Sequence, residues 1–466
     1  MLPVAPFSHA PPALSLFSVR ASLQGLRSAS PPLSPGRPLK ALLGASATAL
    51  LVLVPGRRLR KLRRRVSEDG SRHPTGATSG WTKEGCEVCS QGPGYIWEWG
   101  PGVQVHFDRL APTGGTAGSG SQDFAVVMVH GFGAESGYFD QQLKAVAAAG
   151  GTAYAMDLFG QGGSWPTDDP APNGGSPGGS PVEGGAGDEE WGWGNSLDPR
   201  FAGSHGAGLA FGEPAWLEQL TAFVQNVVTE GRVYLLGNSL GGYLAAKVSA
   251  RGVLGNRVSG LILANATPFW GWFDEGGLAP WDGHLPAPWW VRPIASTWFK
   301  SLRSNIGSML GLVYARAGDL AVQGRLDALA GRISDAAAHP MGAAAFASIL
   351  FAPRQSPSFG DALDQVAANG LPVLLLYGDD DPWVVPFWAQ RAAGRVREVG
   401  EYYGLSPAGH CPHHEAPDAF NEVLVSWLRR READPDAPEV LQVGTVVECR
   451  SETSGQGDLI RMERRL

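Results

Sequence analysis

The chain contains the run Val233-Tyr234-Leu235-Leu236-Gly237-Asn238-Ser239-Leu240-Gly241-Gly242-Tyr243, in which an apolar segment leads into a G-x-S-x-G pentapeptide. The apolar segment indicates a buried strand, and the residues that follow the pentapeptide favour a helix. A serine on so sharp a turn needs small neighbours, which Gly237 and Gly241 supply. The sequence therefore predicts a strand-turn-helix unit that holds the Ser239 hydroxyl out of the sheet as a nucleophile.

A second buried strand, Phe124 to Val129, ends in His130-Gly131-Phe132-Gly133. Backbone N–H groups in an H-G-x-G loop face the nucleophile and can stabilise an oxyanion. We expect the amides of Phe132 and Leu240 to form the oxyanion hole. We expect His130 to hydrogen-bond this loop, with no part in proton transfer.

Two further strands lead to an acid and a histidine. The strand Pro372 to Tyr377 runs into three aspartates followed by Pro382 and Trp383, and the strand Tyr402 to Leu405 is followed by Gly409-His410. Ser, then Asp, then His is the chain order of the α/β-hydrolases and differs from that of chymotrypsin-like and subtilisin-like proteases. The order predicts a catalytic triad of Ser239, Asp381 and His410, with Asp379 and Asp380 as alternative acids and His413 and His414 as exposed or capping residues.

Strands alternate with helical stretches, which predicts an α/β class: an α/β-hydrolase fold with a mostly parallel central sheet flanked by helices. Tyr95 to Trp99 and Val103 to Phe107 are expected to open it as an antiparallel pair. After the sixth strand, Leu261 to Ala264, the sequence predicts a helical cap at about 266–353, with helices over 318–330 and 333–338. The predicted domain spans 81–431 and a C-terminal tail covers 432–466.

Two segments have a composition foreign to a folded domain. From Met1 to Ser67 there is no acidic residue, while serine, proline and arginine are frequent, as is typical of an organelle transit peptide. We therefore expect 1–80 to be a transit peptide and disordered N-terminus. The Gly/Pro-rich insert at about 163–200 is also expected to be disordered, because it has too little apolar surface to bury.

The composition limits the possible partners. A formal net charge of −7 over 466 residues argues against binding nucleic acid. The four cysteines form no disulfide framework, and Cys86 and Cys89 lack the second pair that a metal site would need. No metal and no cofactor is predicted, and Cys411 is expected to be a packing residue.

Aromatic residues gather where the cap begins. Tryptophan offers a large apolar surface with one polar group, which suits a bulky, flat, apolar ligand. The alternative is that these side chains pack the interior of the cap. The predicted substrate-binding residues are Phe269, Trp270, Trp272 and, after the acid, Trp383.

Six groups of segments together carry a resemblance to a known family: Gly237–Tyr243, Asn265–Gly271, His339–Pro340 with Phe346–Ile349 and Ala352–Pro353, Asp381–Val384, Gly160–Gly162 with Trp165–Thr167, and Ser406–His413. They resemble the pheophytinase family, chloroplast hydrolases of chlorophyll breakdown. The resemblance runs from about Gly94 to Arg430 and implies that Ser239, Asp381 and His410 hydrolyse pheophytin a to pheophorbide a and phytol. It also implies a location in the chloroplast stroma, with association at the thylakoid surface or with other chlorophyll-breakdown proteins.

Other functions stay open at this point, because a triad fixes the chemistry of the nucleophile and not the substrate. The alternatives on this fold are a chlorophyll dephytylase, a methylesterase, an acyltransferase and a carbon-carbon bond hydrolase. A hydrolase-like binding module without activity is a further alternative.

Overall fold

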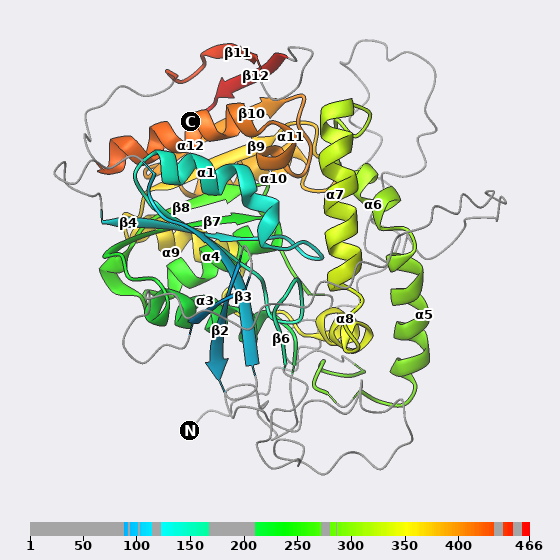
Figure 1. The fold of residues 1–466 in the computed structure, drawn as a ribbon. Helices are drawn as coiled ribbons and strands as arrows, with labels where there is room; N and C mark the ends of the chain where they lie inside the picture. Colours follow the sequence, from blue (N-terminus) through cyan, green and yellow to red (C-terminus); the bar gives the residue numbers. More distant parts are fainter. Residues whose placement is uncertain are drawn as a thin grey trace, which may run out of the picture. The chain divides into compact units, whose positions relative to one another are not determined.

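The computed structural model describes residues 88–91, 94–100, 103–113, 123–166, 210–271, 280–285, 287–432, 441–450 and 459–466. Within these ranges the strands form one twelve-stranded sheet in the order β1-β2-β3-β5-β4-β7-β8-β9-β10-β12-β11, with β6 paired to β3 (Figure 1). The predicted transit peptide, nearly all of the predicted disordered insert, Cys86 and Trp272 lie outside the described residues.

The centre of the sheet is parallel and confirms the predicted architecture. Its Val, Leu and Ala runs are buried along nearly their whole length, as expected for strands with helices on both faces. Each predicted strand is present, with ends within a few residues of those expected. In sheet order the parallel strands are β5 (Thr152–Met156), β4 (Phe124–Val129), β7 (Arg232–Asn238), β8 (Val258–Ala264), β9 (Val373–Gly378) and β10 (Gly400–Ser406).

Antiparallel strands border this centre at one end. The predicted opening pair is present as β2 (Gly94–Gly100) and β3 (Val103–Leu110), with Trp97 opposite Val105. Strand β1 (Val88–Gln91), which was not predicted, pairs with β2, and the short β6 (Trp165–Pro166) pairs with β3.

At the other end, the structure differs from the predicted tail at 432–466. Strand β12 (Leu459–Arg464) pairs with β10, and β11 (Val446–Arg450) pairs with β12. Ile460 and Met462 are buried while Leu459 and Arg461 are exposed, the alternation of a strand with one face on the core. The described part of this segment therefore continues the sheet.

Helices cover both faces of the sheet, and the period of two along each strand divides the core between them. In β4, Phe124, Val126 and Met128 join one hydrophobic cluster, and the alternate residues join the other. Helices α1 (Asp140–Ala148) and α12 (Pro417–Glu432) pack on the first cluster (Figure 1). On the second lie α3 (Glu213–Asn226), α4 (Leu240–Arg251), α9 (Phe359–Ala368) and α10 (Pro386–Arg395).

The chain between β8 and β9 forms the predicted helical cap. It consists of α5 (Val291–Arg303), α6 (Ile306–Val313), α7 (Leu320–Ala336) and α8 (Gly342–Phe351) (Figure 1). The two helices predicted over 318–330 and 333–338 are one helix, because α7 continues through Gly331. A glycine inside a helix costs only about 1 kcal/mol, and burial of Val322, Leu326 and Leu329 along one side offsets it. No helix among the described residues combines the length and the apolar character that a membrane span requires.

The order of the strands reverses beside β4, and the carboxyl end of β4 is therefore where a ligand site is expected. Its parallel neighbours are β5 on one side and β7 on the other, so the chain leaves this part of the sheet in opposite directions. In open α/β sheets ligands bind outside the carboxyl ends of the strands at such a point. The loop after β4 and the turn after β7 are the segments that carry Phe132 and Ser239.

Candidate active site

Ser239 occupies the turn between β7 and α4 in a conformation that few residues adopt. Its backbone has φ 52° and ψ −117°, outside the usual regions for a residue with a side chain. A Cβ atom at Gly237 would lie 2.2 Å from the carbonyl of Gly241, and one at Gly241 would lie 1.9 Å from the carbonyl oxygen of Val129. Both glycines are therefore required for strand and helix to close around the serine, which is half-buried.

The loop after β4 lies directly against this turn. A Cβ atom at Gly131 would stand 3.1 Å from the Cβ of Ser239. Leu240 is the first residue of α4. The N–H groups of the first helical turn have no acceptor within the helix, so the N–H of Leu240 is available to another group. The predicted oxyanion-hole residues, Phe132 and Leu240, thus lie on two segments that flank Ser239.

His130 fixes the base of the same loop. Its Nε2 accepts a hydrogen bond from the Leu158 N–H (3.0 Å), so Nδ1 carries the proton and donates to the Gly131 carbonyl (2.7 Å). The side chain is fully buried, and burial lowers the pKa of its imidazole. The structure confirms the expected hydrogen bond to the loop.

Asp381 and His410 form a buried pair at the ends of β9 and β10. The Nδ1 atom of His410 lies 2.7 Å from Oδ2 of Asp381. The other carboxylate oxygen accepts from the N–H groups of Trp383 (2.7 Å) and Val384 (3.0 Å). Burial alone would raise the pKa of Asp381, but the His410 imidazole and these hydrogen bonds hold it below its ordinary value. The acid is therefore ionised and fixes which nitrogen of His410 carries the proton.

The three adjacent aspartates have three different partners. Asp379 makes a two-pronged ion pair with Arg465, with N–O distances of 2.6 and 2.7 Å. Asp380 accepts a hydrogen bond from the Ser406 hydroxyl at 2.9 Å. Of the three, Asp381 is the one that lies in contact with His410, and Asp379 anchors the segment after β12.

Two asparagines that the sequence analysis left without a role hold these parts together. The Nδ2 atom of Asn265 donates to Asp381 (2.7 Å), and its Oδ1 accepts from the Gly378 N–H (2.8 Å). The Nδ2 atom of Asn238 donates to the carbonyls of Ala264 and His410, both at 3.0 Å. Each asparagine lies at the carboxyl end of a parallel strand, which is the signal that could have pointed to them.

The loop that carries His410 is also joined to the cap. The His410 N–H donates to the Val313 carbonyl (3.0 Å) at the end of α6. Glu415 accepts from the Gly409 N–H (2.8 Å) and from the Arg316 N–H (3.0 Å), which lies in the loop between α6 and α7. Burial raises the pKa of Glu415 to about 7, although these backbone hydrogen bonds oppose the shift.

His413 and His414 are buried, which contradicts the expectation that they are exposed or capping residues. They lie on the short helix α11 (Pro412–Glu415), which packs against Tyr138 and Phe139 rather than facing solvent. Burial lowers the pKa of His413 well below its ordinary value, and it lowers that of His414 to about 3. Neither histidine is a charged group near neutral pH. The neighbouring Cys411 is buried in an apolar cluster, as predicted for a packing residue.

The predicted substrate-binding aromatics differ in their surroundings. The side chains of Phe269 and Trp383 are 54% and 56% exposed, and the Trp383 ring lies 5.7 Å from that of His410. Trp270 is half-buried and its ring lies 5.3 Å from that of Phe132. Trp272 is outside the described residues.

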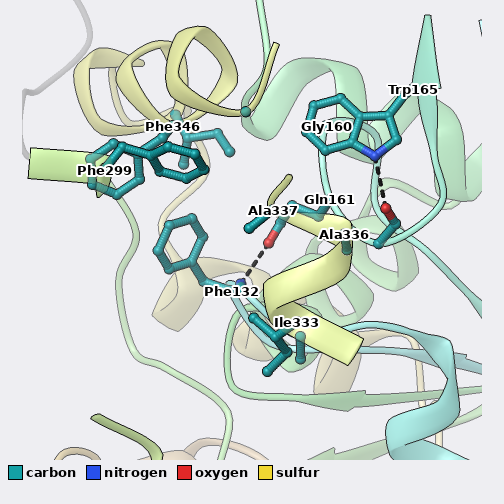
Figure 2. Close-up of a pocket in the computed structure, with 14 residues that line it drawn as sticks. Phe132, Gly160, Gln161, Trp165, Phe299, Ile333, Ala336, Ala337 and Phe346 are labelled. Atoms are coloured by element: carbon teal, nitrogen blue, oxygen red, sulfur yellow. Dashed lines mark hydrogen bonds between the residues drawn. The ribbon is translucent and has the colours of Figure 1, made fainter. Parts of the chain in front are cut away.

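A small pocket lies beside the Phe132 loop, under the cap (Figure 2). Its volume is about 80 Å³, and Phe269, Trp270 and Trp383 are not among the described residues that line it. Of its lining residues, the sequence analysis assigned a role only to Phe132, as part of the oxyanion hole. Gly133 and Ala134 lie on the same loop after β4. The remaining lining residues come from the loop after β5 and from the cap, and include Gln161, Trp165, Phe299, Ile333 and Phe346.

No group of three or more metal-binding side chains occurs within the ranges that the structure describes. The chemistry that this arrangement can perform uses a hydroxyl, an imidazole, a carboxylate and backbone N–H groups.

The chain is similar to several known proteins. Pheophytinase of Arabidopsis thaliana, a chloroplastic protein, is 35% identical over 348 residues, which cover 72% of this chain and 66% of that protein. The chain thus spans about two thirds of the length of that relative. Solved structures similar to it include an esterase from Thermogutta terrifontis (TM-score 0.47, 19% identity, 71% of this chain and 95% of that one). An enol-lactonase from Burkholderia xenovorans is similar at TM-score 0.47 and 16% identity, over 71% of this chain and 98% of that one.

The family model of the α/β hydrolases matches residues 126–423, which run from within β4 to the first half of α12 and therefore contain nearly all of the parallel centre of the sheet together with the cap. The chain therefore belongs to the α/β hydrolase family, and the Ser239 turn, the strand order and the cap agree with this.

Proposed function

We propose that this chain is a serine ester hydrolase in which Ser239 is the nucleophile, His410 the general base and acid, and Asp381 the acid that orients the histidine. The observation that carries the proposal is the buried His410–Asp381 hydrogen bond of 2.7 Å beside the strained Ser239 turn. Asn238 supports it further, because this neighbour of Ser239 is hydrogen-bonded to the carbonyl of His410.

The geometry suggests how the parts act. Because Asp381 accepts the Nδ1 proton of His410, Nε2 is left with a lone pair that can take the Ser239 proton as the hydroxyl attacks the ester carbon. The amides of Phe132 and Leu240 stabilise the oxyanion of the tetrahedral intermediate. His410 returns the proton to the leaving alcohol, and a water activated by the same histidine then releases the acid. Each step moves only protons and the acyl group.

We propose pheophytin a as the substrate, with pheophorbide a and phytol as the products. The similarity to a relative named pheophytinase supports this assignment, as do the exposed ring of Trp383 beside His410 and the exposed ring of Phe269. Exposed aromatic faces of this kind suit a flat, apolar macrocycle. No nucleic-acid partner is proposed, and binding at the thylakoid surface or to other chlorophyll-breakdown proteins remains part of the proposal.

We also propose that the protein works in the chloroplast. The name of the relative includes that compartment, and residues 1–67 contain no acidic residue. A fusion of residues 1–80 to a fluorescent reporter should enter plastids. A reporter that stays in the cytosol or is secreted would contradict this location.

The test of the activity is incubation of the purified protein with pheophytin a and with chlorophyll a, followed by chromatography of the pigments. Release of pheophorbide a supports the proposal, and release of chlorophyllide alone would make the protein a chlorophyll dephytylase. A fluorophosphonate that labels wild type but not Ser239→Ala separates an enzyme from a binding module. Turnover of short acyl esters without either pigment would favour a methylesterase, an acyltransferase or another esterase of this fold.

A further inference from the structure

Gln161 lines the pocket under the cap and has a side-chain hydrogen-bond donor that no described residue accepts. Its side chain is only 6% exposed, and its Nε2 atom has no hydrogen-bond partner in the described part of the chain. The orientation of the amide is fixed, because Oε1 accepts a hydrogen bond of 2.7 Å from the Gly133 N–H, and a nitrogen could not take that place. Burying a donor without an acceptor costs free energy, and a ligand oxygen that accepted this hydrogen bond would offset that cost.

The loop that carries Gln161 is rigid before any ligand arrives. The buried carboxylate of Asp157 accepts from the Gly163 N–H (2.7 Å) and contacts His106 Nδ1 (2.9 Å). The Trp165 indole N–H donates to the Gly162 carbonyl (2.7 Å), and its ring stacks on His339 at 4.1 Å. The Nε2 donor of Gln161 is therefore held in place, as specific recognition requires.

The rest of the pocket is apolar and small. Figure 2 shows Gln161 between the Phe132 ring, the end of α7 at Ala336 and Ala337, and Trp165. At about 80 Å³ the pocket is far below the roughly 300 Å³ or more that a whole small-molecule ligand occupies. It can hold a side group of a larger ligand. Because Phe132 is shared with the predicted oxyanion loop, that group must stand close to the ester that reacts.

We propose that this pocket binds a small apolar group bearing one carbonyl oxygen, and that Gln161 Nε2 donates a hydrogen bond to that oxygen. The assignment rests on the proposed function and deepens it. In pheophytin a, the methoxycarbonyl group on the isocyclic ring has this chemistry and stands beside the propionyl ester. Gln161 is then a substrate-binding residue that selects pigments retaining the methoxycarbonyl group.

The experiment compares two pigments and four proteins. Pheophytin a and pyropheophytin a differ only in that hydrogen replaces the methoxycarbonyl group in the second. The proteins are wild type, Gln161→Met, which removes the donor, Ala337→Leu, which fills the pocket, and Ala338→Leu, a matched change at an exposed neighbour. The quantity measured is the ratio of kcat/KM for the two pigments, with 4-nitrophenyl butyrate as a common reference substrate.

Wild type and Ala338→Leu should prefer pheophytin a by about tenfold, the contribution of one ordinary hydrogen bond. Gln161→Met and Ala337→Leu should bring the ratio close to one. Loss of the hydrogen bond to Gly133 in Gln161→Met affects both pigments equally, so a purely structural role cannot move the ratio. If Gln161→Met does not fold, Ala337→Leu decides.

An unchanged ratio in both pocket variants, or a ratio of one in wild type, would overturn the inference while dephytylation of pheophytin stands. If neither pigment is hydrolysed but the short ester is, the proposed substrate is wrong and the inference falls with it.

Discussion

The carboxyl edge of the sheet and the cap are stabilised in different ways. At the edge, Ser239 is fixed by glycines that no other residue can replace, and Asp381 accepts four hydrogen bonds. In the cap, aromatic contacts such as that of Phe346 with Trp298 join α8, which is mostly buried, to α5. The described side chains of α5, α6 and α7 are largely half-buried or exposed. The difference suggests a division of tasks in the proposed reaction: the edge fixes the positions of Ser239, Asp381 and His410, and the cap surrounds the ligand.

The largest expected effect tests whether the edge is the seat of the chemistry. Ser239→Ala should lower kcat by about 10⁴-fold or more, because removing a triad member leaves only the oxyanion hole and binding. The melting temperature should hardly change, since the hydroxyl is half-buried at a turn. Ser249→Ala, within the helix α4 that follows Ser239, is the matched control and should keep its activity. Pigment turnover by Ser239→Ala near the wild-type rate would refute the serine-hydrolase mechanism.

The next effect distinguishes the three aspartates at the edge. Asp381→Asn should lower kcat by about 10⁴-fold, because an amide at this place favours the wrong tautomer of His410. Asp379→Asn and Asp380→Asn should keep most of the activity, and Asp379→Asn should lower the melting temperature through its lost ion pair with Arg465. Measurement of kcat and Tm for the three variants tests this. A severe loss of kcat confined to Asp379 or Asp380 would move the acid to that residue.

A smaller effect, on KM, is expected for the exposed rings of Phe269 and Trp383. Phe269→Ala and Trp383→Ala should raise KM for pheophytin a by about five- to tenfold, with kcat and Tm nearly unchanged, because each ring contributes one aromatic contact. Trp289→Ala is the control, since Trp289 is exposed and has no assigned role. Equal KM values for all three variants and wild type would show that these rings do not bind the pigment.

The last prediction concerns Glu415, which joins the edge to the cap. The smallest effect on turnover is expected here, and the quantity that should change is the free energy of unfolding. Its pKa is raised to about 7 in the folded protein from an ordinary value of 4.5, so the folded state binds the extra proton between these values. Its contribution to stability is therefore full below pH 4.5 and falls as the pH rises to 7, by up to about 3 kcal/mol.

Urea unfolding of wild type and Glu415→Gln at pH 4.5 and pH 7.5 measures this contribution. The free energy of unfolding of wild type should fall relative to that of the variant as the pH rises. Parallel pH dependences for the two proteins would contradict the assignment.

The fold and the edge could be predicted largely because their signals are local. Apolar runs mark the parallel strands, and the glycines on either side of Ser239 mark the turn. The contacts of Asn265 could not be predicted, because its partner Asp381 lies 116 residues away. The pocket was missed for the same reason, because Gln161, Ala337 and Phe346 are far apart in the sequence and line one pocket only in the folded chain. Strands β11 and β12 were missed because their short alternating patterns are weak signals beside charged residues.

The conformation of Ser239 has a consequence for helix α4. Ser239 stands at the N-cap position, where a serine side chain normally accepts a hydrogen bond from the first turn and stabilises the helix by about 1 kcal/mol. With its positive φ, the side chain makes no such bond, and the first turn of α4 contains no acidic residue. The helix therefore begins uncapped, with the positive end of its dipole facing the nucleophile. In the proposed reaction the oxyanion supplies the missing cap, so the first turn of α4 has its acceptor only while the tetrahedral intermediate exists, before the ester bond breaks.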